Sequence, residues 1–521
     1  MKHYLLKTLL MAAVLAVVTT VDAKSTFKGQ KTVDGFTYYM FKDNETGEDY
    51  ARVNIEWNTE THASGHYTML SQVTGDDGVT YPCTKAELFF ELSGKQACPD
   101  LTRLTFPDSY TSILVSHALV TKIDLSSAAK DITIRDCHGL TGLDLPEGLT
   151  KIIVENNDGL TELDLPEGMT IINSLAYNRN LARIGIPSSV QELGSVSGCS
   201  SLETLSLPPT MTSIAPRAFY RSGLKSITIP KGITVLQECF LECEQLEEVV
   251  IGDDVETLLG AFDFCKSLKR VTFGTGLKTI GDFSFRWTAI EEMDIPDHVT
   301  LICQCAFASC RKLKRVHLGK GITSLEGPIH EYYTPYVHTT GYIFSGCDQL
   351  EEVTAENAIT VIGDYVFGSC TLSEIPFGNR IETIGKQAFF STPLVNIVLP
   401  GTVKSIGDEA FGWSPYMSYG EDVHKAVYSY AANPPTLGSD VFTSQSLSRP
   451  LYVPRGRVQA YRNAAGWDAF TDIHEMDVPT SIDAVTNDNT SATGSYTLDG
   501  RHITTLQHGV NIVNGRKVIV K

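Results

Sequence analysis

Positive charge is scarce in this sequence. Its 521 residues include 42 lysines and arginines against 61 aspartates and glutamates, which leaves a formal net charge of −19 at pH 7. Proteins that bind nucleic acid need a basic face for the phosphate backbone, so this balance argues against such a partner. Long apolar runs are also absent after residue 23, and we expect no membrane-spanning segment in the rest of the chain.

Catalytic signatures are missing as well. The sequence has no P-loop, no H-E-x-x-H and no G-x-S-x-G motif. Gly274–Gly281 offers several glycines, but a short strand pattern follows it instead of the long helix that a phosphate-binding loop opens. Asp43–Tyr50 is acidic, yet its glycine is misplaced for a calcium loop. We therefore predict a non-enzymatic protein with no cofactor and no metal ion.

Residues 1–23 have the pattern of a secretory signal peptide. Lys2 and Lys7 flank the start of the apolar stretch Leu9–Val18, and Val21–Ala23 fits a cleavage site. The alternative, a retained membrane anchor, is disfavoured because the apolar run is short. No cysteine precedes Cys83, which excludes a lipoprotein modification at this signal. The prediction is a secreted protein, extracellular or held at the cell surface.

One pattern dominates the rest of the chain. Apolar-x-x-apolar-x-apolar recurs at steps of 19 to 23 residues, with one step of 37. Alternation places these apolar residues on one face of a short strand, and one copy cannot bury that face alone. Copies must therefore stack, as leucine-rich repeats do. They begin at Leu101, Val120, Leu140, Leu160, Leu181, Leu202, Leu224, Leu246, Leu268, Ile290, Leu313, Leu350, Leu372 and Leu394.

The second half of each later copy carries a small or aliphatic residue followed by phenylalanine, as in Ala218-Phe219. Segments such as "LKSITIPKGITVLQECF" and "LVNIVLPGTVKSIGDEAFGWS" resemble repeats of the BspA-like leucine-rich-repeat surface proteins. The resemblance covers Leu181–Phe470 and weakens towards Leu101, and Leu451–Phe470 is similar to the closing segment of that family. It implies adhesion to host matrix proteins or to other cells. The tail, Ser495–Lys521, resembles a C-terminal module of secreted proteins from gut and oral bacteria.

The predicted fold is a β-rich leucine-rich-repeat solenoid, with short parallel strands and short helical or irregular turns. Its N-terminal segment alternates like strands but lacks the repeat, so it is a β cap or a small β domain. The tail is a sorting module, or a small β module without that role. The predicted parts are 1–23 signal peptide, 24–99 N-terminal β segment, 100–450 solenoid, 451–476 C-terminal cap with an amphipathic helix, 477–494 linker and 495–521 β tail.

Twelve cysteines in a secreted chain suggest disulfides, but most of them share one repeat position. Recurrence at one position predicts a buried row of small apolar side chains, with bridges as the alternative. A bridge between Cys83 and Cys98, outside the repeats, stays open. Cys303 and Cys305 occupy the glycine and glutamate positions of "IGDEAF", which disfavours a metal site. The row comprises Cys137, Cys199, Cys243, Cys265, Cys310, Cys347 and Cys370.

Candidate contact residues fall into two groups. Asp124, Asp144 and Asp164 recur at one exposed strand position, which makes them either a strip for a cation or basic ligand or a solvated acidic face. Two insertions are rich in aromatic residues, which either contact a glycan or protein or pack against the repeats. Their candidates are Tyr332, Tyr333 and Tyr336 in the first insertion, and Trp413, Tyr416 and Tyr419 in the second.

Charged pairs follow the first apolar residue of five consecutive copies, and their sign alternates. Glu247-Glu248 precedes Lys269-Arg270, and the later pairs continue this order to Glu351-Glu352. Only parallel strands in register would set each pair against opposite charge. We therefore expect Lys314-Arg315 to stabilise the stack instead of binding a polyanion.

The resemblance implies a protein that recognises a host or bacterial surface protein, and we expect it to be a monomer. A glycan-binding accessory protein of polysaccharide use is the alternative, and a hydrolase is a remote one.

Overall fold

The computed structural model describes residues 25–55, 63–92, 95–96, 98–328, 341–356, 358–377, 380–414 and 423–477, and four strands of the C-terminal tail. The predicted signal peptide lies outside the described residues. Contacts divide the chain into an N-terminal unit, Met1–Glu291 with His298–Leu313 and Ile329–Thr334, and a C-terminal unit formed by the remainder. No helix among the described residues is long and apolar enough to cross a membrane.

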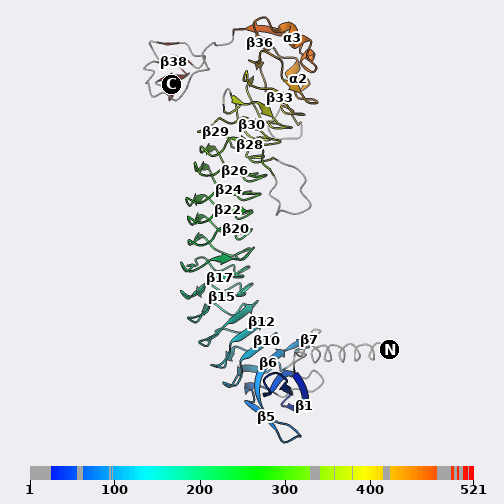
Figure 1. The fold of residues 1–521 in the computed structure, drawn as a ribbon, viewed down its shortest axis with the longest axis vertical. Helices are drawn as coiled ribbons and strands as arrows, with labels where there is room; N and C mark the ends of the chain where they lie inside the picture. The colour runs from blue at the N-terminus through cyan, green and yellow to red at the C-terminus, as the bar shows by residue number, and fades with distance from the viewer. Residues whose placement is uncertain are drawn as a thin grey trace, which may run out of the picture. The chain divides into compact units, whose positions relative to one another are not determined.

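The N-terminal unit begins with a mixed sheet that runs directly into the first repeats. Its initial strands are antiparallel neighbours, and β6 then pairs in parallel with both β3 and β10. The N-terminal β segment therefore shares a sheet with the solenoid (Figure 1). The sheet order is β1 (Ser25–Val33), β2 (Phe36–Asp43), β3 (Asp49–Ile55), β6 (Thr80–Phe89), β10 (Ser112–Ser116), β12 (Asp131–Arg135) and β13 (Lys151–Glu155), with β5 (Gln72–Thr74) beside β6 and a separate β7 (Glu91–Leu92)–β8 (Lys95–Gln96) pair.

The repeats of this unit form two rows of parallel strands. The front strands contain the repeated apolar pattern, and the back strands lie in the second half of each repeat. The front strands are β9 (Leu101–Thr105), which also pairs with β4 (Gly65–Thr68), β11 (Lys122–Asp124), β14 (Glu162–Asp164), β16 (Arg183–Gly185), β19 (Ser226–Thr228), β21 (Glu248–Val250) and β23 (Arg270–Thr272). After β13, the back strands are β15 (Ile171–Ile172), β17 (Glu192–Leu193), β18 (Ser213–Ile214), β20 (Val235–Gln237), β22 (Thr257–Leu259), β24 (Thr279–Ile280) and β26 (Leu301–Ile302).

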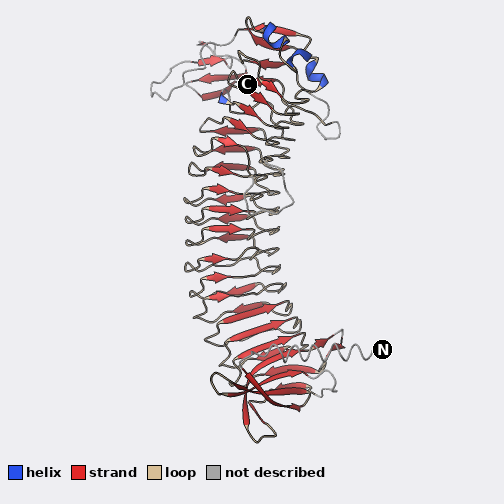
Figure 2. Ribbon diagram, turned by 45° about the vertical axis from the view of Figure 1, so that its right-hand side comes forward, coloured by secondary structure: helices blue, strands red, loops and turns tan. Residues whose placement is uncertain are grey.

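The C-terminal unit repeats the two-row arrangement (Figure 2). Its front strands are β25 (Glu292–Ile295), β27 (Arg315–Leu318), β29 (Glu352–Ala355), β32 (Ile397–Leu399), β34 (Val427–Ser429), β36 (Leu451–Pro454) and β37 (Ile473–Met476). The back strands are β28 (Ser324–Leu325), β30 (Val361–Ile362), β31 (Thr383–Ile384), β33 (Ser405–Ile406) and β35 (Thr436–Leu437). The tail strands are β38 (Ser495–Thr497), β39 (His502–Ile503), β40 (Gly509–Val513) and β41 (Arg516–Val520). Together the units confirm the predicted solenoid of short parallel strands.

Short helices close the last repeats of the C-terminal unit: α2 (Ser444–Leu447), α3 (Val458–Arg462) and the 3-10 helix η2 (Trp467–Ala469). Tyr461 and Trp467 are fully buried, whereas Ala465 between them is exposed. The Trp467 indole donates a hydrogen bond to the Pro435 carbonyl at 2.8 Å, and its ring lies 5.5 Å from that of Phe442. These contacts place Trp467 at the end of the phenylalanine row, and the Tyr461 ring packs edge-on against it at 5.1 Å.

Phenylalanine rings form a stacked row through the interior of each unit. In the N-terminal unit, Phe262 lies 5.4 Å from both Phe240 and Phe285, with nearly parallel ring planes. The spacing slightly exceeds the distance between neighbouring strands, about 4.8 Å, so one ring fits each repeat. The N-terminal row is Phe219, Phe240, Phe262, Phe285 and Phe307, and the C-terminal row is Phe344, Phe367, Phe389, Phe411 and Phe442.

The predicted cysteine row is confirmed, and all twelve cysteines are free thiols. Several buried thiols also donate hydrogen bonds to the backbone, as Cys243 Sγ does to the Phe219 carbonyl at 2.8 Å. Burial raises the pKa of the Cys243 thiol to about 11, which keeps the proton needed for this bond. Asn157 and Asn178 occupy the same position in earlier repeats and hydrogen-bond to buried backbone groups there. Cysteine thus acts as a small donor as well as an apolar filler. Cys83 and Cys98, whose pairing the sequence left open, are buried and unbridged.

The alternating charges face one another as predicted. Glu248 pairs in register with Arg270, and their side chains lie 2.7 Å apart. In the C-terminal unit, Arg315 lies in register between Glu292 and Glu352 and forms an ion pair with Glu292. The basic pairs are therefore neutralised by their neighbours, which confirms the parallel register.

Candidate functional site

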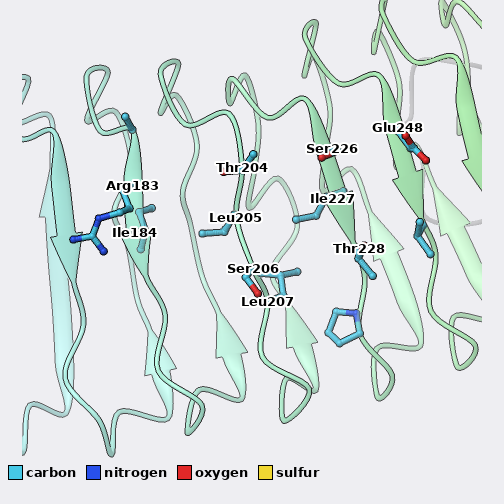
Figure 3. A pocket seen from close by; sticks show the side chains of 13 residues that line it. Arg183, Ile184, Thr204, Leu205, Ser206, Leu207, Ser226, Ile227, Thr228 and Glu248 are labelled. Carbon is cyan, nitrogen blue, oxygen red and sulfur yellow. The ribbon is translucent and has the colours of Figure 1, made fainter.

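An open hollow of about 690 Å³ lies over the front strands of the N-terminal unit. Figure 3 shows Arg183 at one end and Glu248 at the other, with Thr204, Leu205 and Ser226 between them. We call this feature the front hollow. It is lined by Ala182, Arg183, Ile184, Thr204, Leu205, Ser206, Leu207, Ser226, Ile227, Thr228, Pro230, Glu248 and Val250.

Short side chains create the front hollow. Most front strands carry at least one long or charged residue at their two exposed positions, but two adjacent repeats carry only hydroxyl residues there: Thr204 with Ser206, and Ser226 with Thr228. The first of these repeats also lacks regular strand pairing, so it falls between β16 and β19. Apolar side chains between the hydroxyls form a floor that is nearly closed, with Leu205 only 9% exposed.

The charged groups at the ends of the front hollow are held by partners outside it. The Arg183 guanidinium donates to Asp164 at 2.6 and 2.7 Å and to Glu162 at 3.0 and 3.2 Å. These bonds raise the pKa of Arg183 and lower that of Asp164. At the far end Glu248 accepts from Arg270 at 2.7 Å, which raises the pKa of the arginine.

The interior of the front hollow is consequently uncharged. It offers aliphatic carbon and hydroxyls, and no side chain of the described residues hydrogen-bonds to the hydroxyl of Thr204, Ser206, Ser226 or Thr228. Hydroxyls both donate and accept, so all four are available to a ligand. No histidine or cysteine lines the site, and its one carboxylate is already paired. The chemistry available is that of binding by contact and hydrogen bonds.

One protein-family model matches part of the chain. Residues 177–260, 235–332 and 338–419 match the model of the BspA type leucine rich repeat region, with six copies. The chain carries a BspA-type leucine-rich-repeat region. The front hollow lies within it, because Ala182 to Val250 fall inside the first two matched segments. No curated protein matches the chain.

Several solved structures are similar to this chain. A leucine-rich repeat protein from Bacteroides ovatus is 20% identical over 88% of this chain and 99% of its own, with a TM-score of 0.48. A leucine rich cell surface protein from Faecalibacterium prausnitzii is 18% identical over 64% and 96%, with a TM-score of 0.37. The pneumococcal vaccine antigen PcpA is 14% identical over 86% and 99%, with a TM-score of 0.39.

Arginine side chains lie beside two members of the predicted aspartate strip. Asp124 forms an ion pair with Arg103 and accepts from Thr105 at 2.7 Å, and these bonds lower its pKa to about 2. Asp164 is paired with Arg183, as described above. Asp144 follows Gly142, which bridges to Lys122 in the neighbouring repeat. The row is therefore not an unbalanced series of carboxylates, because arginines from adjacent repeats reach two of its members.

Among the described residues, no cluster of three or more histidine, cysteine, aspartate or glutamate side chains could hold a metal ion.

Most of the predicted aromatic contacts, Tyr332, Tyr333, Tyr336, Tyr416 and Tyr419, lie outside the described residues. Trp413 is described: it is half-buried, and its ring lies edge-on to the buried His424 at 6.4 Å. Trp413 thus has a packing contact, and its contact with a ligand stays a prediction.

Sequence reasoning missed the front hollow, although a signal for it was present. The exposed positions of "LETLSLP" and "LKSITIP" hold only threonine and serine, between a repeat with Arg183 and one with Glu248. We selected the aspartates as candidates because of their charge. The change from long to short exposed side chains is the sequence signal that corresponds to the front hollow.

Proposed function

We propose that this protein is a non-enzymatic recognition protein, secreted or held at the cell surface, that adheres to a host matrix protein or to a protein on another cell. The observation that carries the proposal is the front hollow within the BspA-type region. Stacked repeats present wide, regular surfaces of this kind to protein partners.

The composition of the front hollow supports a protein partner. Its four hydroxyls can pair with backbone N–H and C=O groups, and its floor can cover an apolar side chain. The Arg183 and Glu248 ion pairs fix the two ends before a ligand arrives, so little side-chain entropy is lost on binding. The acidic balance of the chain, with a net charge of −19, disfavours acidic partners over most of its surface.

Binding of the purified mature chain to a panel of immobilised matrix proteins tests the proposal. The informative variant is Ser226→Arg, which places a long cation inside the front hollow. Its matched control is Ser213→Arg, the same change at an exposed serine of back strand β18 in the same unit. We expect saturable binding that Ser226→Arg weakens by about tenfold or more and Ser213→Arg preserves, since one blocked contact of about 1.4 kcal/mol accounts for a factor of ten.

Two results would contradict the proposal. Absence of saturable binding to every protein of the panel would remove the adhesive function. Equal loss of binding in both variants would show that added charge, and not occupation of the front hollow, is responsible. Surface location is tested separately: protease added to intact cells should digest the protein, and complete protection with a periplasmic location would exclude display.

A further inference from the structure

A second hollow, of about 710 Å³, lies on the sheet of the N-terminal β segment. It crosses strands that Figure 1 labels β6, β10 and β12, together with neighbouring β2 and β3. We call it the basic hollow. Its lining is Phe41, Tyr50, Arg52, Lys85, Glu87, Thr111, Ser112, Lys130, Asp131 and Thr150. Its size falls within the ~300–1,000 Å³ that is usual for ligand sites.

As in the front hollow, a short side chain lies between longer ones, and the strand register decides which residues are neighbours. Arg52 pairs with Lys85, Lys85 with Ser112, and Ser112 with Asp131, so these residues form one row across four parallel strands. Ser112 lies in this row between Lys85 and Asp131, and its short side chain leaves space beside the long Lys85 side chain. Thr111 and Thr150 flank Lys130 through backbone hydrogen bonds of 2.8 Å each. Three hydroxyls therefore surround the lysines.

The charge of this hollow is opposite to that of the chain. Three cations line it against two carboxylates, in a protein of net charge −19. Arg52 is paired with Glu87, but among the described residues neither Lys85 nor Lys130 forms an ion pair. The Lys85 ammonium instead lies 5.5 Å from the centre of the Tyr50 ring, over its face. Two exposed amines are thus available to an anion.

The other groups select among anions. The Ser112 hydroxyl can accept and donate hydrogen bonds. The Thr111 and Thr150 hydroxyls already donate to the Thr84 and Lys130 carbonyls, so they offer only acceptor sites, and the Asp131 carboxylate can accept from hydroxyl groups. The half-buried Tyr50 ring adds an apolar edge. An anion that also carries many hydroxyl groups can bind the two lysines with its charge and donate hydrogen bonds to Asp131. A carboxylate-rich peptide would bring few hydrogen-bond donors for Asp131. We propose that the basic hollow binds an acidic oligosaccharide, in which a sugar carboxylate or sulfate lies between Lys85 and Lys130.

Calorimetric titration of the full mature chain tests this site. The probes are a sulfated heparin oligosaccharide, a hyaluronan oligosaccharide with carboxylates only, neutral maltohexaose, poly-glutamate and inorganic sulfate. The informative variant is Lys85→Gln with Lys130→Gln. The control is Lys312→Gln with Lys266→Gln, which changes the charge by the same amount. Both lysines are exposed and lie in the same unit, far along the chain from the basic hollow. Lys85→Arg with Lys130→Arg keeps the charge and tests rescue.

We expect one or both acidic oligosaccharides to bind the wild type and the control, and maltohexaose not to bind. The glutamine pair should weaken binding about tenfold or more, as loss of charged hydrogen bonds does, and the arginine pair should restore most of it. Higher salt should weaken binding, because the amines are exposed.

Several outcomes overturn the proposal. Binding of no acidic oligosaccharide, or equal binding by the glutamine pair, removes the site. Poly-glutamate that competes as well as the sugars makes it a site for acidic protein segments. Full competition by inorganic sulfate at matched sulfate concentration reduces it to an anion site without sugar recognition.

Discussion

The phenylalanine row should fail locally when one ring is removed, and Phe262 is the most informative position. Its side chain is fully buried, with Phe240 and Phe285 each 5.4 Å away and tilted by only 10° and 15°. Truncation to alanine removes a buried aromatic side chain, which costs ~3–5 kcal/mol. Of this, the two ring pairs contribute ~0.5–1.5 kcal/mol each.

Phe262→Leu separates the two contributions, since leucine keeps much of the volume but neither ring pair. We expect it to cost ~1–3 kcal/mol, below the alanine variant. Each repeat contacts only its neighbours, so the loss should be confined to nearby coils. Hydrogen exchange followed along the chain is the appropriate assay, because it reports the opening free energy of each segment.

The expected result is faster exchange in the back strands β20, β22 and β24, with the N-terminal sheet unchanged. Uniformly faster exchange along the whole chain would refute the local reasoning. Equal costs for alanine and leucine would show that the ring pairs add nothing measurable beyond volume.

Three further predictions concern charge and thiols. Arg315→Glu should lower the melting temperature, more at low salt, because like charges in register cost ~0.2–1 kcal/mol per pair. Adding Glu292→Arg to the same chain should recover part of the loss. An unchanged melting temperature of the Arg315→Glu variant would contradict the register. The carboxyl of Asp124 has its pKa lowered to about 2 from 3.8, so its stabilisation is full above the unfolded value and is lost as pH falls through 3.8 towards 2. Above about pH 4 the free energy of unfolding of the wild type should therefore exceed that of Asp124→Asn by ~1 kcal/mol, after allowance for solvent screening, and this difference should shrink as the pH falls towards 2. Curves that stay parallel down to pH 2 would argue against the Arg103 contact. Cys243 should resist alkylation in the folded protein at pH 8, since its pKa is raised to about 11, and rapid labelling would contradict its burial. Cys243→Ala should lower the free energy of unfolding by ~1–2 kcal/mol, because the hydrogen bond to the Phe219 carbonyl is lost.

Much of the fold could be predicted because a solenoid converts sequence period into spatial neighbourhood. Residues one repeat apart become adjacent, so the positions of Cys243 and Phe262 within their repeats were enough to place them in interior rows. The same reasoning predicted that Glu248 lies beside Arg270, one repeat later, as it does in the structure. The N-terminal β segment was harder, because its strands lack the period that assigns register.

The candidate site was less accessible to this reasoning. We expected Asp124 and Asp164 to form part of an acidic row, and their strand positions agree with that expectation. The repeat pattern did not show that Arg103 and Arg183 turn towards them. Side-chain direction decides this, and long flexible side chains have several rotamers compatible with one backbone.

By itself, the sequence determined the repeat, the rows of strands, the buried phenylalanine and cysteine positions and the alternation of charge, because each depends on period and polarity alone. Only the tertiary structure decided where the surface is concave. The front hollow and the basic hollow both arise where short hydroxyl side chains, such as Ser226 and Ser112, lie between longer ones contributed by repeats or strands about 20 residues apart or more. A concavity is a difference in height between neighbours, and the neighbours are known only once the strands are in register.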